Sequence, residues 1–182
     1  MVVSSGGFYP VSDTKKLNAL EKKLITVENR LMLERNKKRF RETKQKRSYG
    51  KMFLIAGALD YYDEPILTDK ETIELGALII TTKCNCYKIA VILGALNMTL
   101  KKCNDDKYLQ NCINIGDQFY ESNKLESPYN FFLGVSLKAQ KLLSDSKNIT
   151  LCNEIGDQLF TENKNRKLEK YKEYMANKTA TI

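Results

Sequence analysis

Apolar residues recur at every third or fourth position in one stretch near the start of the chain. The stretch consists of Leu17, Leu20, Leu24, Val27 and Leu31. This spacing is the a/d pattern of two heptads, and Ser12 or Asp13 can cap a helix ahead of it. Because nothing that breaks a helix follows before Ser48, the pattern predicts one long helix over residues 13–50.

These five residues, which we call the Leu stripe, allow two interpretations. The stripe can pair with a second copy of the chain, because an a/d seam is the contact surface of a coiled coil. It can equally pack on the chain's own domain, since two heptads are fewer than the three or four that identify a coiled coil from sequence. A homodimer and an intramolecular helix contact therefore both remain open at this point.

Where the apolar seam stops, a run of basic residues begins. Residues 35–51 contain nine Lys or Arg and one acid, Glu42, a net charge of +8. The whole chain of 182 residues also has a net charge of +8, so the rest of the chain balances to zero. A block of like charge repels itself unless an anionic partner neutralises it.

Nucleic acid, another anion or plain solvent can each account for the basic run. A lipid-binding helix would need a stronger apolar face than Phe40 provides. Phosphates fit better, because Lys and Arg release counterions from nucleic acid and Arg can bind phosphate or guanine in a bidentate manner. The predicted DNA-contacting residues are Lys37, Lys38, Arg39, Arg41, Lys44, Lys46 and Arg47.

The second half of the chain repeats itself. Residues 111–124 (NCINIGDQFYESNK) and 151–164 (LCNEIGDQLFTENK) share seven of fourteen residues at an offset of 40. The same offset relates Leu93-Gly94 to Leu133-Gly134. A period of this length without alternating strand patterns is typical of helix pairs packed on one another. We therefore expect units in which an LG helix, a polar loop and an IGDQ helix follow in order.

The predicted fold is all-α, with a long amphipathic and basic N-terminal helix followed by stacked helical hairpins. The expected layout is a disordered lead over 1–12, the long helix over 13–50, a repeat-like domain over 51–168 and a frayed tail over 169–182. No apolar run approaches the roughly 20 residues that span a bilayer, so we expect no membrane insertion. The first ten residues lack the features of a secretory signal, which favours a cytoplasmic location.

The residue inventory argues against an enzyme. There is no histidine, which removes Cys₂His₂ zinc sites and His-based nucleophilic systems, and no phosphate-binding glycine motif is present. The five cysteines are odd in number and sit among apolar residues, so we expect free, buried thiols. The sequence therefore predicts no catalytic residue, no metal site and no cofactor.

Residues 28–100 resemble one known family. They contain a charged helix with an Arg/Lys-rich run that leads into KMFLIAGAL, and then IELGALIITTKCNCYKIAVILGAL, with two LGAL pieces eighteen residues apart. This layout is similar to small conjugal transfer proteins of the TraD type. The basic run stands ahead of KMFLIAGAL instead of directly before IELGAL, and the IGDQ units extend the chain. The resemblance implies a non-catalytic accessory protein that acts with a relaxase at a plasmid transfer origin.

Two hypotheses follow from the sequence. The first is a DNA-binding accessory factor of conjugative transfer, which uses the basic run to contact phosphates. The second is a helical-repeat module for protein–protein interaction, in which Phe131-Phe132 and the IGDQ units present a groove and the basic segment is incidental.

Overall fold

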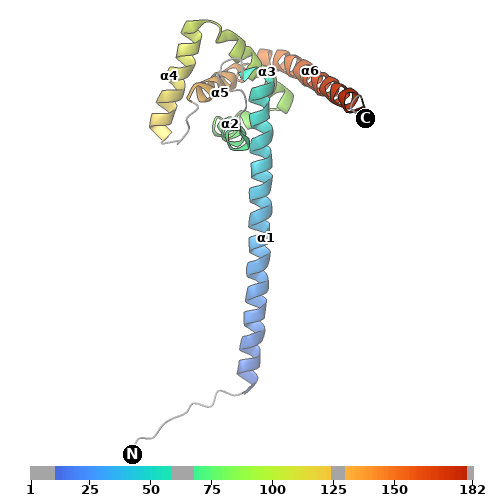
Figure 1. The fold of residues 1–182 in the computed structure, drawn as a ribbon. Helices are drawn as coiled ribbons and strands as arrows, with labels where there is room; N and C mark the ends of the chain where they lie inside the picture. The colour runs from blue at the N-terminus through green and yellow to red at the C-terminus, as the bar shows by residue number, and fades with distance from the viewer. Residues whose placement is uncertain (1–10, 59–67, 124–129, 180–182) are drawn as a thin grey trace, which may run out of the picture. The chain divides into compact units, whose positions relative to one another are not determined.

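A computed structural model describes residues 11–58, 68–123 and 130–179. Within these ranges the chain forms helices and no strand. The helices are α1 (Val11–Ile55), α2 (Asp69–Thr81), the 3-10 turn η2 (Cys84–Cys86), α3 (Ile89–Lys102), α4 (Asp106–Asn123), α5 (Asn130–Leu143) and α6 (Ser146–Thr179) (Figure 1). The predicted all-α fold with a long first helix is confirmed.

The chain divides into two units, Met1–Glu42 and Thr43–Ile182, and α1 contributes to both. In the first unit every described side chain, from Lys16 to Glu42, is exposed. The second unit contains the hydrophobic core. The first unit therefore relies on helix propensity and local ion pairs, whereas the second is stabilised by burial of apolar surface.

The last turns of α1 belong to the core of the second unit. Met52 and Phe53 are buried, and the Phe53 ring meets the Phe132 ring edge-on with centroids 5.7 Å apart. After the helix ends, the Ala56 carbonyl accepts a 3.0 Å hydrogen bond from the buried Asn97 Nδ2. The boundary that we expected at residue 50 is thus wrong, because α1 continues to Ile55 as a core element.

The six α-helices of the described ranges cross in three pairs, and glycines lie at each crossing. The pairs are α1 with α2 through Gly50 and Gly76, α3 with α6 through Gly94 and Gly156, and α4 with α5 through Gly116 and Gly134. A Cβ atom on any of these six glycines would overlap a backbone carbonyl oxygen of the partner helix. The helices therefore approach backbone to backbone, closer than any side chain permits.

Each crossing has the same internal relation. Gly94 faces Cys152, which lies four residues before Gly156, and Gly156 faces Ala90, four residues before Gly94. Residues four positions apart lie on one face of a helix, in successive turns. The contact is therefore formed by two successive turns of each helix. The α1·α2 crossing repeats this relation, since Gly76 faces Lys46 and Gly50 faces Thr72.

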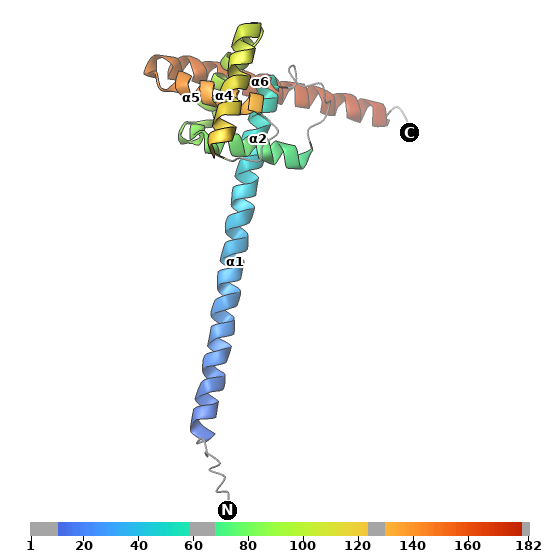
Figure 2. The same ribbon diagram turned by 90° about the vertical axis from the view of Figure 1, so that its left-hand side faces the viewer.

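Each helix of one 40-residue repeat unit crosses a helix of the other repeat unit. Gly134 lies 40 positions after Gly94, and Cys112 lies 40 positions before Cys152. The contact of Gly94 with Cys152 therefore corresponds to the contact of Gly134 with Cys112. The helix α3 packs mainly on α6, and α4 packs mainly on α5. Figures 1 and 2 show α4 lying across α5 in both views. The two helices of one repeat unit therefore pack on the helices of the other repeat unit more than on each other.

The polar loops of the two repeat units end in equivalent helix caps. Asp105 Oδ1 accepts hydrogen bonds from the backbone N–H groups of Lys107 and Tyr108, at 2.8 and 3.2 Å, where α4 begins. Asp145 Oδ1 accepts one from Lys147 at 3.0 Å where α6 begins. These aspartates satisfy N–H groups that lack a partner within the helix, and they fix both turns where the sequence predicted loops.

The ends of the chain differ from the expected layout. The helix α6 continues to Thr179, so the prediction of a frayed tail from residue 169 is wrong for the described residues. Residues 1–10 of the expected disordered lead lie outside the described residues, and the last two, Val11 and Ser12, belong to α1. The long sequence of α6 contains no proline or glycine after Gly156, and its many Lys and Glu residues favour a helix.

The Gly116→Ala variant tests the backbone contact. On helix propensity alone, this change should stabilise α4 by about 1 kcal/mol. Because the new Cβ would overlap the Asn130 carbonyl, we expect instead a loss of about 1–3 kcal/mol, the usual cost of overpacking. Urea unfolding would measure the change, with the exposed Gln118→Ala on the same helix as control. A Gly116→Ala protein as stable as the control would contradict the close contact.

Candidate nucleic-acid interface

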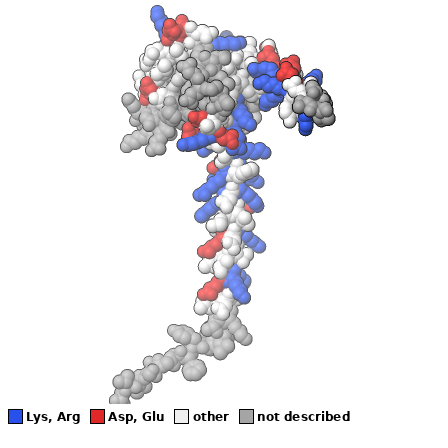
Figure 3. Space-filling model, in the orientation of Figure 1, with Lys and Arg blue, Asp and Glu red and all other residues white. Residues whose placement is uncertain are grey.

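The part of the basic run in the first unit is an exposed cationic helix surface. Residues 35–42 lie on α1 and all are exposed. Since consecutive residues are 100° apart around a helix, the five cations among them point to several sides instead of one. They are Arg35, Lys37, Lys38, Arg39 and Arg41. Figure 3 shows blue Lys and Arg side chains on both edges of α1.

Local acids neutralise this surface only in part. Lys37 Nζ donates a 2.8 Å hydrogen bond to Glu34, and this bond lowers the pKa of the Glu34 carboxyl. Lys38 Nζ lies 4.0 Å from Glu42. In the described part of the chain, Arg39 and Arg41 have no ion pair. These two guanidinium groups can therefore bind an external anion without breaking an ion pair, although the charge of Arg41 also helps to lower the pKa of Glu34.

The part of the basic run in the second unit serves the fold as well. Arg47 Nη2 donates a 3.2 Å hydrogen bond to Asp69 Oδ2 on α2, and Arg47 Nε is buried without a partner. The Lys46 carbonyl lies against Gly76, so the Lys46 backbone forms part of a helix crossing. Of the predicted contact residues in this unit, Lys44 is exposed, whereas Lys46 and Arg47 are partly buried. Lys46 and Arg47 thus have structural roles that the sequence did not reveal.

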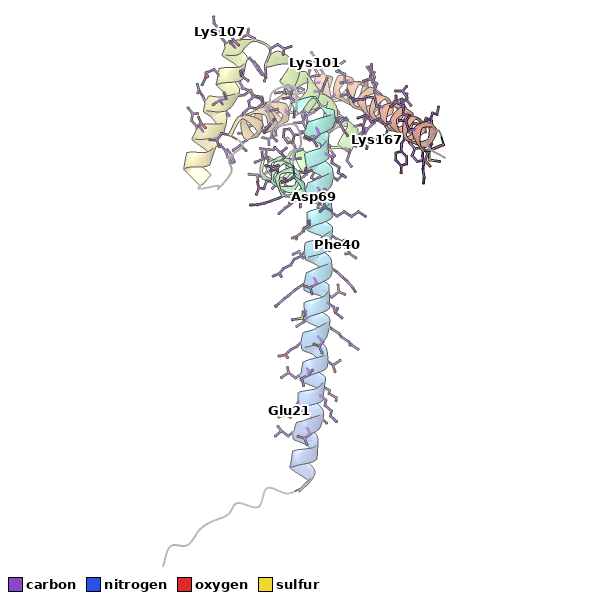
Figure 4. The ribbon with its side chains drawn as sticks, viewed as in Figure 1. Glu21, Phe40, Asp69, Lys101, Lys107 and Lys167 are labelled. Carbon is purple, nitrogen blue, oxygen red and sulfur yellow. The ribbon has the colours of Figure 1, made fainter. Side chains whose placement is uncertain are left out.

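The Leu stripe is uncovered. Leu17, Leu20, Leu24, Val27 and Leu31 are each between 50% and 61% exposed. Phe40, labelled in Figure 4, is 72% exposed on the same helix. Both interpretations of the stripe, pairing with a second copy and packing on the chain's own domain, remain predictions.

The predicted groove at Phe131-Phe132 is wrong for Phe132. Phe132 is 1% exposed and packs on Phe53, so it belongs to the core. In the first IGDQ unit, Asp117 Oδ1 accepts a 2.6 Å hydrogen bond from Asn130 Nδ2, which joins α4 to α5 next to the glycine crossing. The glycine and aspartate of this unit therefore hold two helices together.

A groove that the sequence did not predict lies elsewhere in the second unit. Its volume is about 550 Å³, and it is lined by Met52, Ile55, Ile89 and Phe160, with Ser48, Lys51, Asn163, Lys164 and Lys167 as polar neighbours. Figure 4 labels Lys167 on α6. The apolar floor and the three lysines come from three helices far apart in sequence, which explains why no sequence motif marks them.

The described residues contain no group of three or more Cys, Asp or Glu that could hold a metal ion. All five cysteines are free thiols, of which Cys86 alone is exposed. Cys103 Sγ lies 3.9 Å from Cys112 Sγ, and this contact raises the pKa of Cys103 while it lowers that of Cys112. Burial raises the pKa of Cys84 and Cys152. The expectation of buried thiols holds for four of the five.

None of the described helices has the length and apolar character that crossing a membrane requires. No protein-family model, curated protein or solved structure matches the chain.

The burial of the thiols predicts a single reactive cysteine. Ellman's reagent needs access to a thiolate, and four thiols are enclosed in the core. We expect the folded protein to react quickly at one thiol and to release the other four equivalents only after denaturant is added. A Cys86→Ser variant should lose the fast phase. Rapid reaction of two or more thiols in the folded protein would contradict this burial pattern.

Proposed function

We propose that the chain binds DNA through the basic run and acts as a non-catalytic accessory protein. The observation that supports this proposal is the exposed cationic surface of residues 35–42, in which Arg39 and Arg41 have no ion pair with any acid that the structure describes. Arginine is suited to phosphate because its planar guanidinium can donate two parallel hydrogen bonds.

The dimensions of this surface suit a nucleic-acid backbone. From Arg35 to Arg41 a helix rises by roughly 9 Å, and each DNA strand offers a phosphate about every 3.4 Å of its axis. The five cations can thus meet about three phosphates on a strand and still leave side chains for the other strand. An anionic lipid surface is a poorer partner, because the one large apolar residue between Arg35 and Arg41 is Phe40.

The setting of plasmid transfer follows from the resemblance of residues 28–100 to the TraD family. In this setting the chain would act with a relaxase at a transfer origin and would position DNA without cutting it. The absence of histidine from the sequence is in keeping with a binding role.

The groove supports a second candidate function, the docking of a partner protein. Apolar side chains of Met52, Ile55 and Phe160 form its floor, while Lys51, Lys164 and Lys167 supply positive charge. A helix with an apolar face and acidic flanks would match both features, as in helix-in-groove recognition. This function can coexist with DNA binding.

A three-residue variant tests DNA binding. Lys38→Gln, Arg39→Gln and Arg41→Gln together leave the core untouched, because all three side chains are exposed. We expect affinity for labelled duplex and single-stranded DNA, measured by fluorescence anisotropy, to fall by at least about tenfold. The slope of log affinity against log salt, measured between about 50 and about 200 mM, should fall by about three.

The matched control removes the same charge elsewhere. Lys101, Lys107 and Lys141 are exposed in the second unit, and their replacement by Gln should leave affinity nearly unchanged. Equal losses in both variants would indicate a net-charge effect, and unchanged affinity in the first variant would refute the proposal.

Charge reversal tests the groove. We expect an acidic amphipathic peptide made of Leu and Glu to bind the protein, and a Leu and Lys peptide of the same pattern not to bind. The Lys164→Glu, Lys167→Glu variant should lose at least about tenfold in affinity for the acidic peptide, measured by anisotropy. Equal binding of both peptides, or of both proteins to the acidic peptide, would contradict this function.

A further inference from the structure

The Leu stripe forms a continuous apolar seam that is exposed to solvent. Its five residues are half exposed or more, and they occupy consecutive a and d positions of α1. A seam of this kind is usually covered by another molecule. The charges beside the seam indicate which molecule covers it.

In the heptad register of the stripe, Leu17, Leu24 and Leu31 occupy a, and Leu20 and Val27 occupy d. The flanking e positions are Glu21 and Glu28, and the flanking g positions are Lys16, Lys23 and Arg30. One edge of the seam is therefore acidic and the other basic. All five of these charged side chains are exposed, and none of them forms an ion pair within the described part of the chain.

The arrangement of these charges distinguishes two ways of pairing the helix with itself. In a parallel pair in register, each g residue faces the e residue of the next heptad in the other helix. Lys16 then faces Glu21 of the second copy, and Lys23 faces Glu28, so every such contact is attractive. In an antiparallel pair g faces g and e faces e, which places Lys against Lys or Arg and Glu against Glu. Charge complementarity thus favours the parallel pair.

The same register shows where the pairing ends. After Leu31 the next d position is Glu34 and the next a position is Lys38, so the seam stops being apolar. Arg30 would face Arg35 of the second copy, and this contact is repulsive. The two helices should therefore separate at the first residues of the basic run.

We propose that two copies of this chain pair in parallel and in register along Lys16–Leu31, so that their basic runs begin side by side. The pairing itself is independent of DNA, whereas its use in presenting two cationic segments to one duplex rests on the proposed function. Because the two segments are related by a two-fold axis, a DNA site that engages both of them would have the matching symmetry.

A charge-swapped chain tests the orientation. The variant carries Lys16→Glu, Glu21→Lys, Lys23→Glu and Glu28→Lys, which keeps the net charge and the Leu stripe. In parallel pairs, the original and the swapped chain should each associate with themselves and not with each other. In antiparallel pairs the opposite holds, because the swap turns each repulsive contact in a mixed pair into an attractive one.

Sedimentation velocity of a chain labelled at the exposed Cys86 gives the readout. We expect the labelled original chain to sediment as a dimer when unlabelled original chain is added, and to remain monomeric when the swapped chain is added. Preferential association with the swapped chain would overturn the parallel arrangement. A labelled chain that stays monomeric at the highest soluble concentration of the original chain would overturn the pairing altogether.

A stripe variant separates this inference from the proposed function. Leu24→Gln with Val27→Gln should abolish the dimer and leave the unfolding of the second unit unchanged, since both side chains are exposed in the first unit. Salt-sensitive DNA binding by a chain that never dimerises would leave the proposed function standing and refute the pairing. A chain that forms the dimer and does not bind DNA would support the pairing and refute the proposed function.

Discussion

The contact of backbone with backbone at glycine determines how the second unit is built. At each of three helix crossings, two glycines bring one helix against the carbonyl groups of the other, close enough for Cα–H to carbonyl contacts. A helix-interior glycine costs about 1 kcal/mol relative to alanine, so these positions are stabilising only through the packing that they permit. Once the crossings are set, the large apolar residues of the core, among them Phe53, Leu93 and Phe132, pack around them.

The side chains of helix α1 pass from solvent into the hydrophobic core along the length of the helix. Up to Glu42 its side chains are exposed and its sequence encodes an apolar stripe followed by basic residues. From Tyr49 onward its residues enter a core. Lys46 and Arg47 lie near the transition, where a basic residue can serve the fold through its backbone or through an ion pair with Asp69. Charge in the sequence therefore does not by itself identify a binding residue.

Local features of this chain could be read from its sequence, whereas the pairing of its helices could not. Several features depend on short-range spacing alone. They are the Leu stripe, the basic run, the loops capped by Asp105 and Asp145, and the glycines in helix interiors. The 40-residue repeat shows that two units are alike but not which helices touch, so the exchange of α3 onto α6 was missed. The groove was missed for the same reason, because Met52, Ile89 and Phe160 meet only through tertiary packing. DNA binding, self-association and the role in plasmid transfer remain predictions.

The exchange between the two repeat units has a consequence for how the chain can be divided. The glycines Gly94, Gly116, Gly134 and Gly156 each contact a carbonyl group of the other repeat unit, so neither repeat unit alone contains a complete crossing. A chain opened between α4 and α5 would leave two fragments that are incomplete alone and complementary together. The same complementarity makes the two halves candidates for exchange between molecules, since Gly94 of one chain could meet Cys152 of another with the geometry that it has within one chain.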